Sequence, residues 1–320
     1  MMARVAVTIR DVARQAQVSA STVSRALSAP GLVSEATRQR VLEVVRGLGY
    51  QPNRAARSLI TGRTGNLGIV VPDLENPFFP AVLRGVQTRA GEAGTSVFFC
   101  DSRKDALVEA ELVRTMAAQV DGLVLCGSLL SDEQVAELAD ATPLVLLNRV
   151  VPGVSSVLMD SALGMDQVVA HLESLGHAHH VYLGGPAGWS NHRREQGLRG
   201  RAELLGSFEP NFAGGLVAAE RALATGATAF IAYNDLVALG VLSHLAARGV
   251  RVPEQVSVTG FDDILYAAMC SPALTTVTMP TEEGGQVAVD LLTDLLGGGE
   301  ARTRELPTTL VARASTGRAP

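Results

Sequence analysis

Hydrophobic and polar residues follow two different patterns along this chain. Within the first fifty residues, apolar side chains recur every three or four positions, which is typical of short amphipathic helices. From residue 65 onward, continuous apolar runs end in polar or glycine-rich turns, as strands that are buried on both faces do. The expected strands lie within residues 65–73, 95–101, 121–127, 142–149, 180–186, 228–235 and 256–263.

Amphipathic stretches alternate with these runs, at residues 80–93, 105–119, 161–175, 235–248 and 283–296. Such alternation predicts an α/β fold in which helices cover both faces of parallel sheets. Roughly 250 residues with seven or more strands are too many for one sheet, so two lobes are expected. We expect a first lobe of residues 65–160 plus about 281–302, and a second of 161–280 plus about 303–320.

The first fifty residues predict three short helices that share one small core. Thr8 is a suitable N-cap for the first helix because Asp11, three positions on, can complete a reciprocal cap. Ser19 can cap the second helix and Ser34 the third, which Gly49 ends. An all-helical domain is therefore expected over residues 1–52.

The second of these helices leaves small polar side chains for solvent or a ligand, namely Ala20, Ser21, Thr22, Ser24 and Arg25. Short side chains at the start of a helix allow close approach to base edges in the major groove of DNA. Arg25 can offer two parallel N–H groups to guanine or to phosphate. The alternative interpretation is the solvated face of a small helical bundle.

Residues 1–64, here called the head, differ in net charge from the rest of the chain. Residues 1–64 contain ten arginines and three acids, a net charge of +7, so the remainder carries −12 of the chain's total of −5. A small cationic head on an acidic body is typical of a nucleic-acid-binding protein with a separate second function.

Residues 53–64 predict a linker or a marginal helix of about two turns between Pro52 and Gly62. A helix of this length is unstable alone in water. The segment is therefore either a plain linker or a hinge helix that folds only when a symmetry mate and DNA hold it.

Together these motifs resemble one known family. The segments TIRDVA (8–13), VSASTVSRAL (18–27) and PNRAARSL (52–59) look like those of the lactose-repressor/galactose-repressor (LacI/GalR) family of bacterial transcriptional regulators, and the resemblance spans essentially the whole chain. It implies a helix-turn-helix head, a hinge helix in the minor groove, and two lobes like those of periplasmic sugar-binding proteins. The DNA-binding residues that it implies are Thr8, Ser19, Ala20, Ser21, Thr22, Ser24, Arg25, Asn53, Arg54 and Leu59.

By matching position, Ala20, Ser21 and Arg25 are the base-reading residues of the second helix. Leu59 matches a leucine that wedges between base pairs in the minor groove, where an apolar side chain offsets unstacking by allowing more contact with a bent duplex. From the residues alone, a buried linker leucine is the simpler interpretation of Leu59.

Candidate ligand-binding residues follow the strands, since open parallel sheets bind ligands at the carboxyl ends of their strands. Phe78 and Phe79 follow the first strand and either present aromatic faces to a ligand or fill the core; the resemblance favours the ligand. Asn148 and Arg149 end the fourth strand, where an amide and a guanidinium can hold vicinal hydroxyls. A surface ion pair is the alternative for Arg149.

The segment GGPAGWSNHRREQGL holds the only tryptophan, Trp189, together with Asn191, His192 and Arg193. It lacks the lysine and glycine spacing of phosphate-binding loops. It resembles a cleft-lining segment of the family in which an arginine binds effector oxygens. Counting back from Gly197 places His192 at that position, so either its imidazole or Arg193 is expected to make the contact.

Three further residues match cleft positions of the family. Phe208 matches a stacking aromatic, and Asn234 and Asp262 match polar effector contacts. A structural acceptor for loop amides is the alternative for Asp262. The segment between Leu198 and Phe208 is shorter than is usual in the family, which predicts a shortened edge for the second lobe.

Other chemistry is sparse in the sequence. The three cysteines, Cys100, Cys126 and Cys270, are far apart and fit reduced thiols. The cluster of His177, His179 and His180 is expected to form a solvated turn, because no spacing suggests a metal site. No cofactor and no catalytic motif is indicated. No signal peptide opens the chain and no apolar run reaches the ~20 residues of a membrane span.

These observations predict a cytoplasmic homodimer that binds double-stranded operator DNA, most simply a repressor released by a sugar-like effector. A corepressor-dependent repressor that responds to a purine or another metabolite is the alternative within this class. A sugar-binding protein or an enzyme on the same α/β scaffold is the alternative from another class. No membrane partner is expected.

Overall fold

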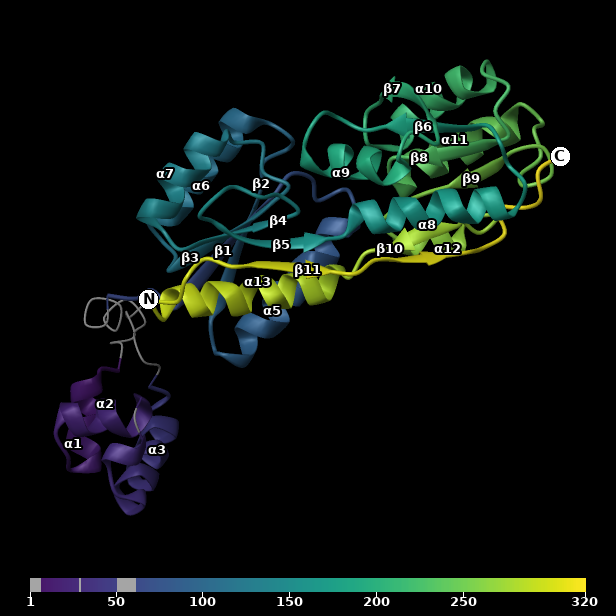
Figure 1. Ribbon diagram of the computed structural model, residues 1–320. Helices are drawn as coiled ribbons and strands as arrows, with labels where there is room; N and C mark the ends of the chain where they lie inside the picture. The colour runs from purple at the N-terminus through teal and green to yellow at the C-terminus, as the bar shows by residue number, and fades with distance from the viewer. Residues whose placement is uncertain (1–6, 29, 51–61) are drawn as a thin grey trace, which may run out of the picture. The chain divides into compact units, whose positions relative to one another are not determined.

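The computed structural model describes residues 7–28, 30–50 and 62–320 (Figure 1). The chain divides into two compact units, Met1–Thr64 and Gly65–Pro320, each with a hydrophobic core of its own. Most of the predicted hinge, including Asn53, Arg54 and Leu59, lies outside the described residues.

The elements described in the first unit are all helices. It forms α1 (Ile9–Ala16), α2 (Ala20–Ser28), a 3-10 turn η1 (Pro30–Leu32) and α3 (Glu35–Leu48). These elements confirm the predicted helix-turn-helix head.

Local hydrogen bonds explain where the head helices begin and end. At the start of α1, the backbone N–H and the hydroxyl of Thr8 both donate to Asp11 Oδ2, at 3.0 and 2.7 Å. Gln17 ends this helix with φ of 56°, a left-handed conformation that turns the chain towards α2. Ser19 Oγ then accepts the backbone N–H of Thr22 at 3.1 Å, which caps α2.

The three head helices share one core, as the apolar spacing predicts. Val12, Ala16, Val23 and Val41 are fully buried within it. Each helix thus contributes one apolar stripe, and the polar face of α2 stays outside.

The second unit begins with a six-stranded sheet, here called the sheet of the first lobe. Every neighbouring pair of its strands is parallel. The strand order is β11 (Thr303–Leu306), β5 (Ser155–Met159), β4 (Leu144–Leu147), β3 (Gly122–Cys126), β1 (Asn66–Val71) and β2 (Ser96–Asp101).

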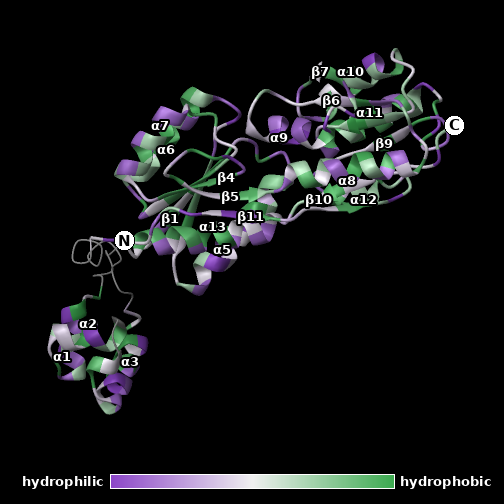
Figure 2. Ribbon diagram, in the orientation of Figure 1, coloured by the Kyte–Doolittle hydropathy of each residue, from purple (hydrophilic) through white to green (hydrophobic). Residues whose placement is uncertain are grey.

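Helices cover both faces of this sheet. Alternate residues of β1 point to opposite sides, so that Ile69 and Val71 join one core cluster while Val70 joins another. The first cluster is covered by α5 (Phe78–Glu92) and α13 (Thr281–Leu296), and the second by α6 (Ala106–Ala117) and α7 (Asp132–Ala141). Figure 2 shows hydrophobic residues along the central strands, as expected for burial on both faces.

The second lobe has a four-stranded parallel sheet with its own helices. Its strand order is β7 (Glu203–Ser207), β6 (His180–Gly184), β8 (Ala229–Ala232) and β9 (Ser257–Thr259). Its helices are α8 (Ser161–Ser174), α9 (Trp189–Leu198), α10 (Phe212–Leu223), α11 (Asp235–Ala247) and α12 (Leu265–Met269). The short segment before Phe208 still forms the edge strand β7.

The chain crosses between the lobes more than once, and one expected boundary is wrong. We expected residues from about 303 in the second lobe, but β11 pairs in parallel with β5 in the sheet of the first lobe. Only after β11 does the chain return, where β12 (Thr309–Val311) pairs antiparallel with β10 (Thr276–Thr278). The charged sequence of β11, TREL, lacks the apolar run that identified the central strands.

The histidine cluster also differs from expectation, because only His179 is exposed. His177 and His180 are each 3% exposed and bonded within the second lobe. His177 Nδ1 lies 2.8 Å from Thr228 Oγ1, and its Nε2 lies 2.9 Å from Ser257 Oγ. The pair is structural. Among the described residues, no helix is both long and apolar enough to cross a bilayer.

We expect His177→Gln to reduce stability in a pH-dependent way. Losing a buried hydrogen-bond partner costs about 1–3 kcal/mol near pH 8. Burial lowers the pKa of His177 below its ordinary 6.5, so the unfolded chain binds the proton first, and the native imidazole contributes less stability as the pH falls below 6.5. The gap in Tm between the wild type and His177→Gln should therefore narrow from pH 8 to pH 5. The exposed His179→Gln is the control, and a gap that is constant with pH would contradict the assignment.

Candidate functional site

A cavity of about 900 Å³ lies between the two lobes, and we call it the interlobe cleft. Its walls are segments that follow β1, β2, β3 and β4 in the first lobe and β6, β7, β8 and β9 in the second. These are the carboxyl ends of parallel strands, where open α/β sheets bind ligands. Topology therefore brings together residues that are up to about 190 positions apart, such as Asp73 and Asp262.

An ion pair forms the floor of the cleft in the second lobe. Arg194 Nη2 donates to Asp262 Oδ1 at 3.1 Å, and the two side chains are only 5% and 6% exposed. The Arg194 guanidinium also lies between two aromatic rings, with its Cζ 4.2 Å from the ring centroids of both Tyr233 and Phe261. These contacts hold a buried positive charge in one orientation.

Arg194 keeps hydrogen-bonding capacity for a ligand. Its Nε and Nη1 N–H groups are buried without an acceptor among the described residues. Leaving such donors unpaired costs free energy, so a ligand oxygen that reaches them is bound strongly. Burial raises the pKa of the Asp262 carboxyl to about 7, although the neighbouring Arg194 charge acts in the opposite direction.

The turn that carries Asp262 has an unusual backbone. Asp262 has φ of 112° and Asp263 has φ of 55°, both in the region that favours glycine. Asp235 holds this turn, because its Oδ2 accepts the backbone N–H of Ile264 at 2.8 Å and its Oδ1 accepts the Thr276 hydroxyl at 2.5 Å. Backbone strain that is held by several contacts is typical of functional sites.

Most of the predicted effector residues line the cleft. They are Phe78, Phe79, Asn148, Arg149, Trp189, Asn191, His192, Asn234 and Asp262. Phe78 is also part of the core below the cleft, as the alternative interpretation has it, and its contact with a ligand stays a prediction. Its ring meets that of Phe79 edge to face at 5.1 Å.

Several of these polar groups already have protein partners. Asn191 Oδ1 accepts from the Tyr182 hydroxyl at 2.9 Å and from Gly185 N at 3.0 Å. Asn234 Oδ1 caps α11 by accepting Val237 N at 2.9 Å. These two side chains therefore shape the cleft wall more than they offer free groups to a ligand.

The pair that ends β4 is also partly engaged. Arg149 Nη2 donates to Asp132 Oδ1 at 2.6 Å, which is the ion pair named as its alternative role, and Nη1 donates to Ser128 O at 2.9 Å. Asn148 Oδ1 accepts Met159 N at 3.0 Å, and its φ of 57° is strained.

Two predicted residues do not line the cleft. Phe208 is 7% exposed and packs in the core of the second lobe, with Arg221 Cζ 5.3 Å from its ring. Arg193 points away from the cleft towards Asp160 and Glu305, at 3.4 and 3.5 Å. For Arg193, the period of helix α9 aims the side chain away from the cleft.

The arginine that faces the cleft is Arg194, which the count from Gly197 missed. The signal was present in the helical period: Asn191, Arg194 and Leu198 are spaced three and four apart, and all three are buried on one face of α9. His192 instead lies at the exposed rim, where its Nε2 is 2.9 Å from Gln196 Nε2.

In the first unit, the candidate DNA-reading surface is the start of α2. Ser21, Ser24 and Arg25 are exposed there. Ser19 Oγ lies 2.8 Å from both Ser21 Oγ and Thr22 Oγ1, so the hydroxyls form an ordered polar cluster. Arg25 extends from the same helix one turn further on.

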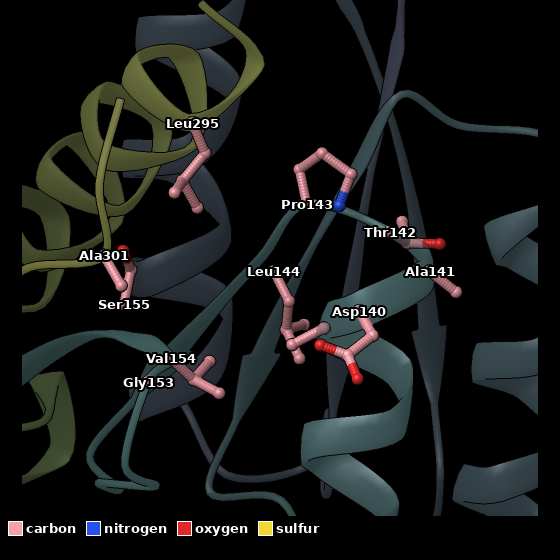
Figure 3. A pocket seen from close by; sticks show the side chains of 11 residues that line it. Asp140, Ala141, Thr142, Pro143, Leu144, Gly153, Val154, Ser155, Leu295 and Ala301 are labelled. Atoms are coloured by element: carbon pink, nitrogen blue, oxygen red, sulfur yellow. The ribbon is translucent and has the colours of Figure 1, made fainter. Parts of the chain in front are cut away.

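Other possible sites are weaker. A second cavity of about 270 Å³ lies at the amino ends of β4 and β5, and Asp140 is the one charged side chain among its lining residues (Figure 3). The described residues contain no cluster of His, Cys, Asp and Glu able to hold a metal ion. Burial raises the pKa of Cys126 to about 12, which keeps this thiol protonated.

Comparison with known proteins agrees with this arrangement. Residues 8–53 match the model of the family described as bacterial regulatory proteins, lacI family, and residues 169–316 match a periplasmic binding protein-like domain. The chain is 35% identical to the HTH-type transcriptional regulator GalS of Salmonella typhimurium, over 89% of this chain and 88% of that protein. It is 31% identical to the HTH-type transcriptional repressor CytR of Escherichia coli, over 97% and 96%.

The fold is similar to that of a solved repressor structure. The crystal structure of the lac repressor dimer bound to operator and the anti-inducer ONPF matches with a TM-score of 0.86 at 28% identity. The match covers 98% of this chain and 100% of that chain.

We expect Gly185→Ala to destabilise the second lobe by about 1–3 kcal/mol through overpacking. A Cβ at this position would lie 2.4 Å from Tyr233 Cδ2, which would displace the ring that covers Arg194. Thermal unfolding measures the cost, and Gly91→Ala, where nothing lies within 4 Å, is the matched control. In a Tyr233→Ala background the cost of Gly185→Ala should fall towards zero. An equal cost in both backgrounds would show that the ring is not the cause.

Proposed function

The chain belongs to the LacI family of bacterial transcriptional regulators, and we propose that it acts as a homodimeric repressor that binds a pseudo-palindromic operator and is released by a small effector in the interlobe cleft. The observation that carries the proposal is the buried pair of Arg194 and Asp262, which faces a 900 Å³ cleft with two donors unpaired. Family membership identifies the chain as a transcriptional regulator and not as an enzyme.

The surface of the head supports operator binding. The start of α2 combines exposed short hydroxyl side chains with one guanidinium, which suits base edges in the major groove. The net charge of +7 over residues 1–64 supplies attraction to phosphates. We propose Ala20, Ser21 and Arg25 as the base-reading residues, with Thr8, Ser19, Thr22 and Ser24 positioning the helix. Asn53, Arg54 and Leu59 complete the proposal in the hinge.

Dimerisation is supported by apolar side chains that stay exposed in both lobes. Phe98 and Phe99 are 43% and 49% exposed on β2, an edge strand of the first sheet. Leu265, Tyr266 and Met269 are 50–70% exposed on α12. Exposed aromatic and aliphatic groups on a strand edge and a short helix are typical of an interface. The lac repressor whose fold matches this chain was solved as a dimer on its operator.

The chain passes between the lobes at residues 160, 279–280 and 307–308, here called the crossover segments. Coupling between the cleft and these segments has a structural route. Arg193 and Arg194 are neighbours on α9: one bonds Asp160 and Glu305 beside the crossovers, and the other faces the cleft. A ligand that displaces α9 therefore also shifts, through the ion pairs of Arg193, the segments about which the lobes rotate. We propose that this rotation changes the spacing of the two hinges in the dimer and releases DNA.

We propose a sugar-like inducer as the effector. Aromatic faces at Phe79 and Trp189 lie among amide and guanidinium donors, a combination that suits a polyhydroxylated ring. If the effector is instead a corepressor such as a purine, its binding should change operator affinity in the opposite direction. Operator affinity measured with and without ligand decides between them, because an inducer lowers affinity and a corepressor raises it.

We expect Arg25→Ala to cost about 1–3 kcal/mol on the specific operator and to relax base preference. The operator is first selected from a random duplex pool, and affinities for it and for scrambled DNA are then measured at several salt concentrations. Arg40→Ala is the control, since it removes the same charge from the exposed face of α3. Both variants should make DNA affinity depend less steeply on salt concentration. Only Arg25→Ala should reduce the ratio of the affinity for the operator to the affinity for scrambled DNA. Unchanged discrimination in Arg25→Ala would refute its base-reading role.

We expect Tyr266→Asp to dissociate the dimer, because it places a charge in a contact that excludes water. Light scattering after gel filtration should show a shift from twice the chain mass towards the 33.5 kDa monomer, with operator affinity lowered at least ~10-fold. Leu204→Asp, on the edge strand β7 where Leu204 is 56% exposed, is the control and should remain dimeric. A dimeric Tyr266→Asp would exclude α12 from the interface.

A further inference from the structure

The interlobe cleft contains three cationic side chains, and each is already neutralised by a carboxylate of the cleft wall. Lys104 Nζ lies 2.8 Å from Asp73 Oδ2. Arg149 pairs with Asp132 at 2.6 Å, and Arg194 pairs with Asp262 at 3.1 Å. All six of these residues line the cleft. An anionic ligand therefore finds no cation without an existing partner.

A fourth carboxylate tips the balance to negative. Glu209 lines the cleft from the loop after β7, is exposed, and makes no hydrogen bond or ion pair through its carboxylate with the described residues. Above about pH 7, where Asp262 is ionised, the cleft thus presents three positive and four negative side chains. A phosphate or carboxylate on a ligand would face this net negative charge, or would have to break a pair and leave one of its acids unpaired.

The groups that stay available are chiefly neutral donors and aromatic faces. Asn76 lines the cleft and is 8% exposed, and its Oδ1 accepts Phe78 N at 3.1 Å, which leaves its Nδ2 donor without a hydrogen-bond partner among the described residues. Arg194 adds two N–H groups whose charge is balanced by Asp262. Trp189 and Phe79 add aromatic surface. Such donors match hydroxyl and carbonyl oxygens.

We propose that the interlobe cleft selects an uncharged, oxygen-rich ligand and excludes the phosphorylated or carboxylated form of the same skeleton. The inference deepens the proposed function and rests on it, because it concerns the ligand of the same cleft. The three ion pairs within the cleft exclude an anionic ligand because they leave it no unpaired cation, and Glu209 strengthens the exclusion by repelling the anion.

The test uses matched ligand pairs that differ by one phosphate: ribose and ribose 5-phosphate, glucose and glucose 6-phosphate, galactose and galactose 1-phosphate, and adenosine and adenosine monophosphate. Binding to the full-length protein is followed by calorimetry and by the emission of Trp189, the only tryptophan of the chain, which lines the cleft. We expect at least one neutral member to bind at least ~10-fold more tightly than its phosphorylated partner. Equal or tighter binding of the phosphorylated member overturns the proposal, and so does a panel in which no neutral member binds.

A charge-reversal variant separates electrostatic selection from simple exclusion by size. Glu209→Lys supplies the cleft with an unpaired cation and should raise the affinity for the phosphorylated member ~10-fold relative to the affinity for the neutral member. Glu254→Lys, an exposed acid outside the cleft wall, makes the same change in total charge and should alter neither. Unchanged selectivity in Glu209→Lys, or an equal effect of Glu254→Lys, overturns the proposal.

Failure of the proposed function gives a different result. If a neutral ligand binds selectively but leaves operator affinity unchanged, the assignment of ligand class stands and the repressor mechanism fails. If a phosphorylated ligand alone releases the operator, the ligand class is wrong and the repressor mechanism stands.

Discussion

The wall that the second lobe contributes to the interlobe cleft depends on the burial of one guanidinium, that of Arg194. A charge at the position of Arg194 is stable there only if a carboxylate, apolar faces and rigid neighbours replace the water that it loses. Asp262, whose own φ is 112°, supplies the negative charge, and the rings of Tyr233 and Phe261 supply the apolar faces. Gly185 is needed because a side chain there would collide with the Tyr233 ring. Loops after three different strands are therefore matched to one side chain.

The overall fold could be predicted because its central strands are buried on both faces. A run such as NLGIVV needs no partner information, since its five buried residues, LGIVV, are all apolar. The edge strands β11 and β7 could not be predicted in this way. The strand β11 reads TREL and β7 reads ELLGS, and both have exposed polar residues that only their position at a sheet edge explains. Whether 303–306 belongs to the first or second lobe depends on long-range pairing, which local pattern does not contain.

The candidate site was predictable to the level of the loop but not of the side chain. Strand ends correctly indicated that residues near Asn148, Asn234 and Asp262 face the cleft. The choice among His192, Arg193 and Arg194 required the phase of a helix whose start at Trp189 follows a glycine turn with no capping side chain. A shift of one residue rotates a side chain by about 100° and exchanges a cleft contact for an ion pair with Asp160. Phe208 was misassigned because an aromatic residue suits a core as well as a ligand.

The distribution of apolar and charged contacts between the lobes determines how they can move. One continuous core contains residues of both lobes, such as Met159 and Phe261, on the side of the crossover segments. There the helix α8 packs so closely that a Cβ on Gly164 would lie 2.7 Å from Val277 Cγ1. On the opposite side, the lobes face each other across polar and charged residues of the cleft. Separating the lobes would expose the shared core to water, which is unfavourable, so the motion that fits our proposal is a rotation that keeps this core buried and changes the cleft.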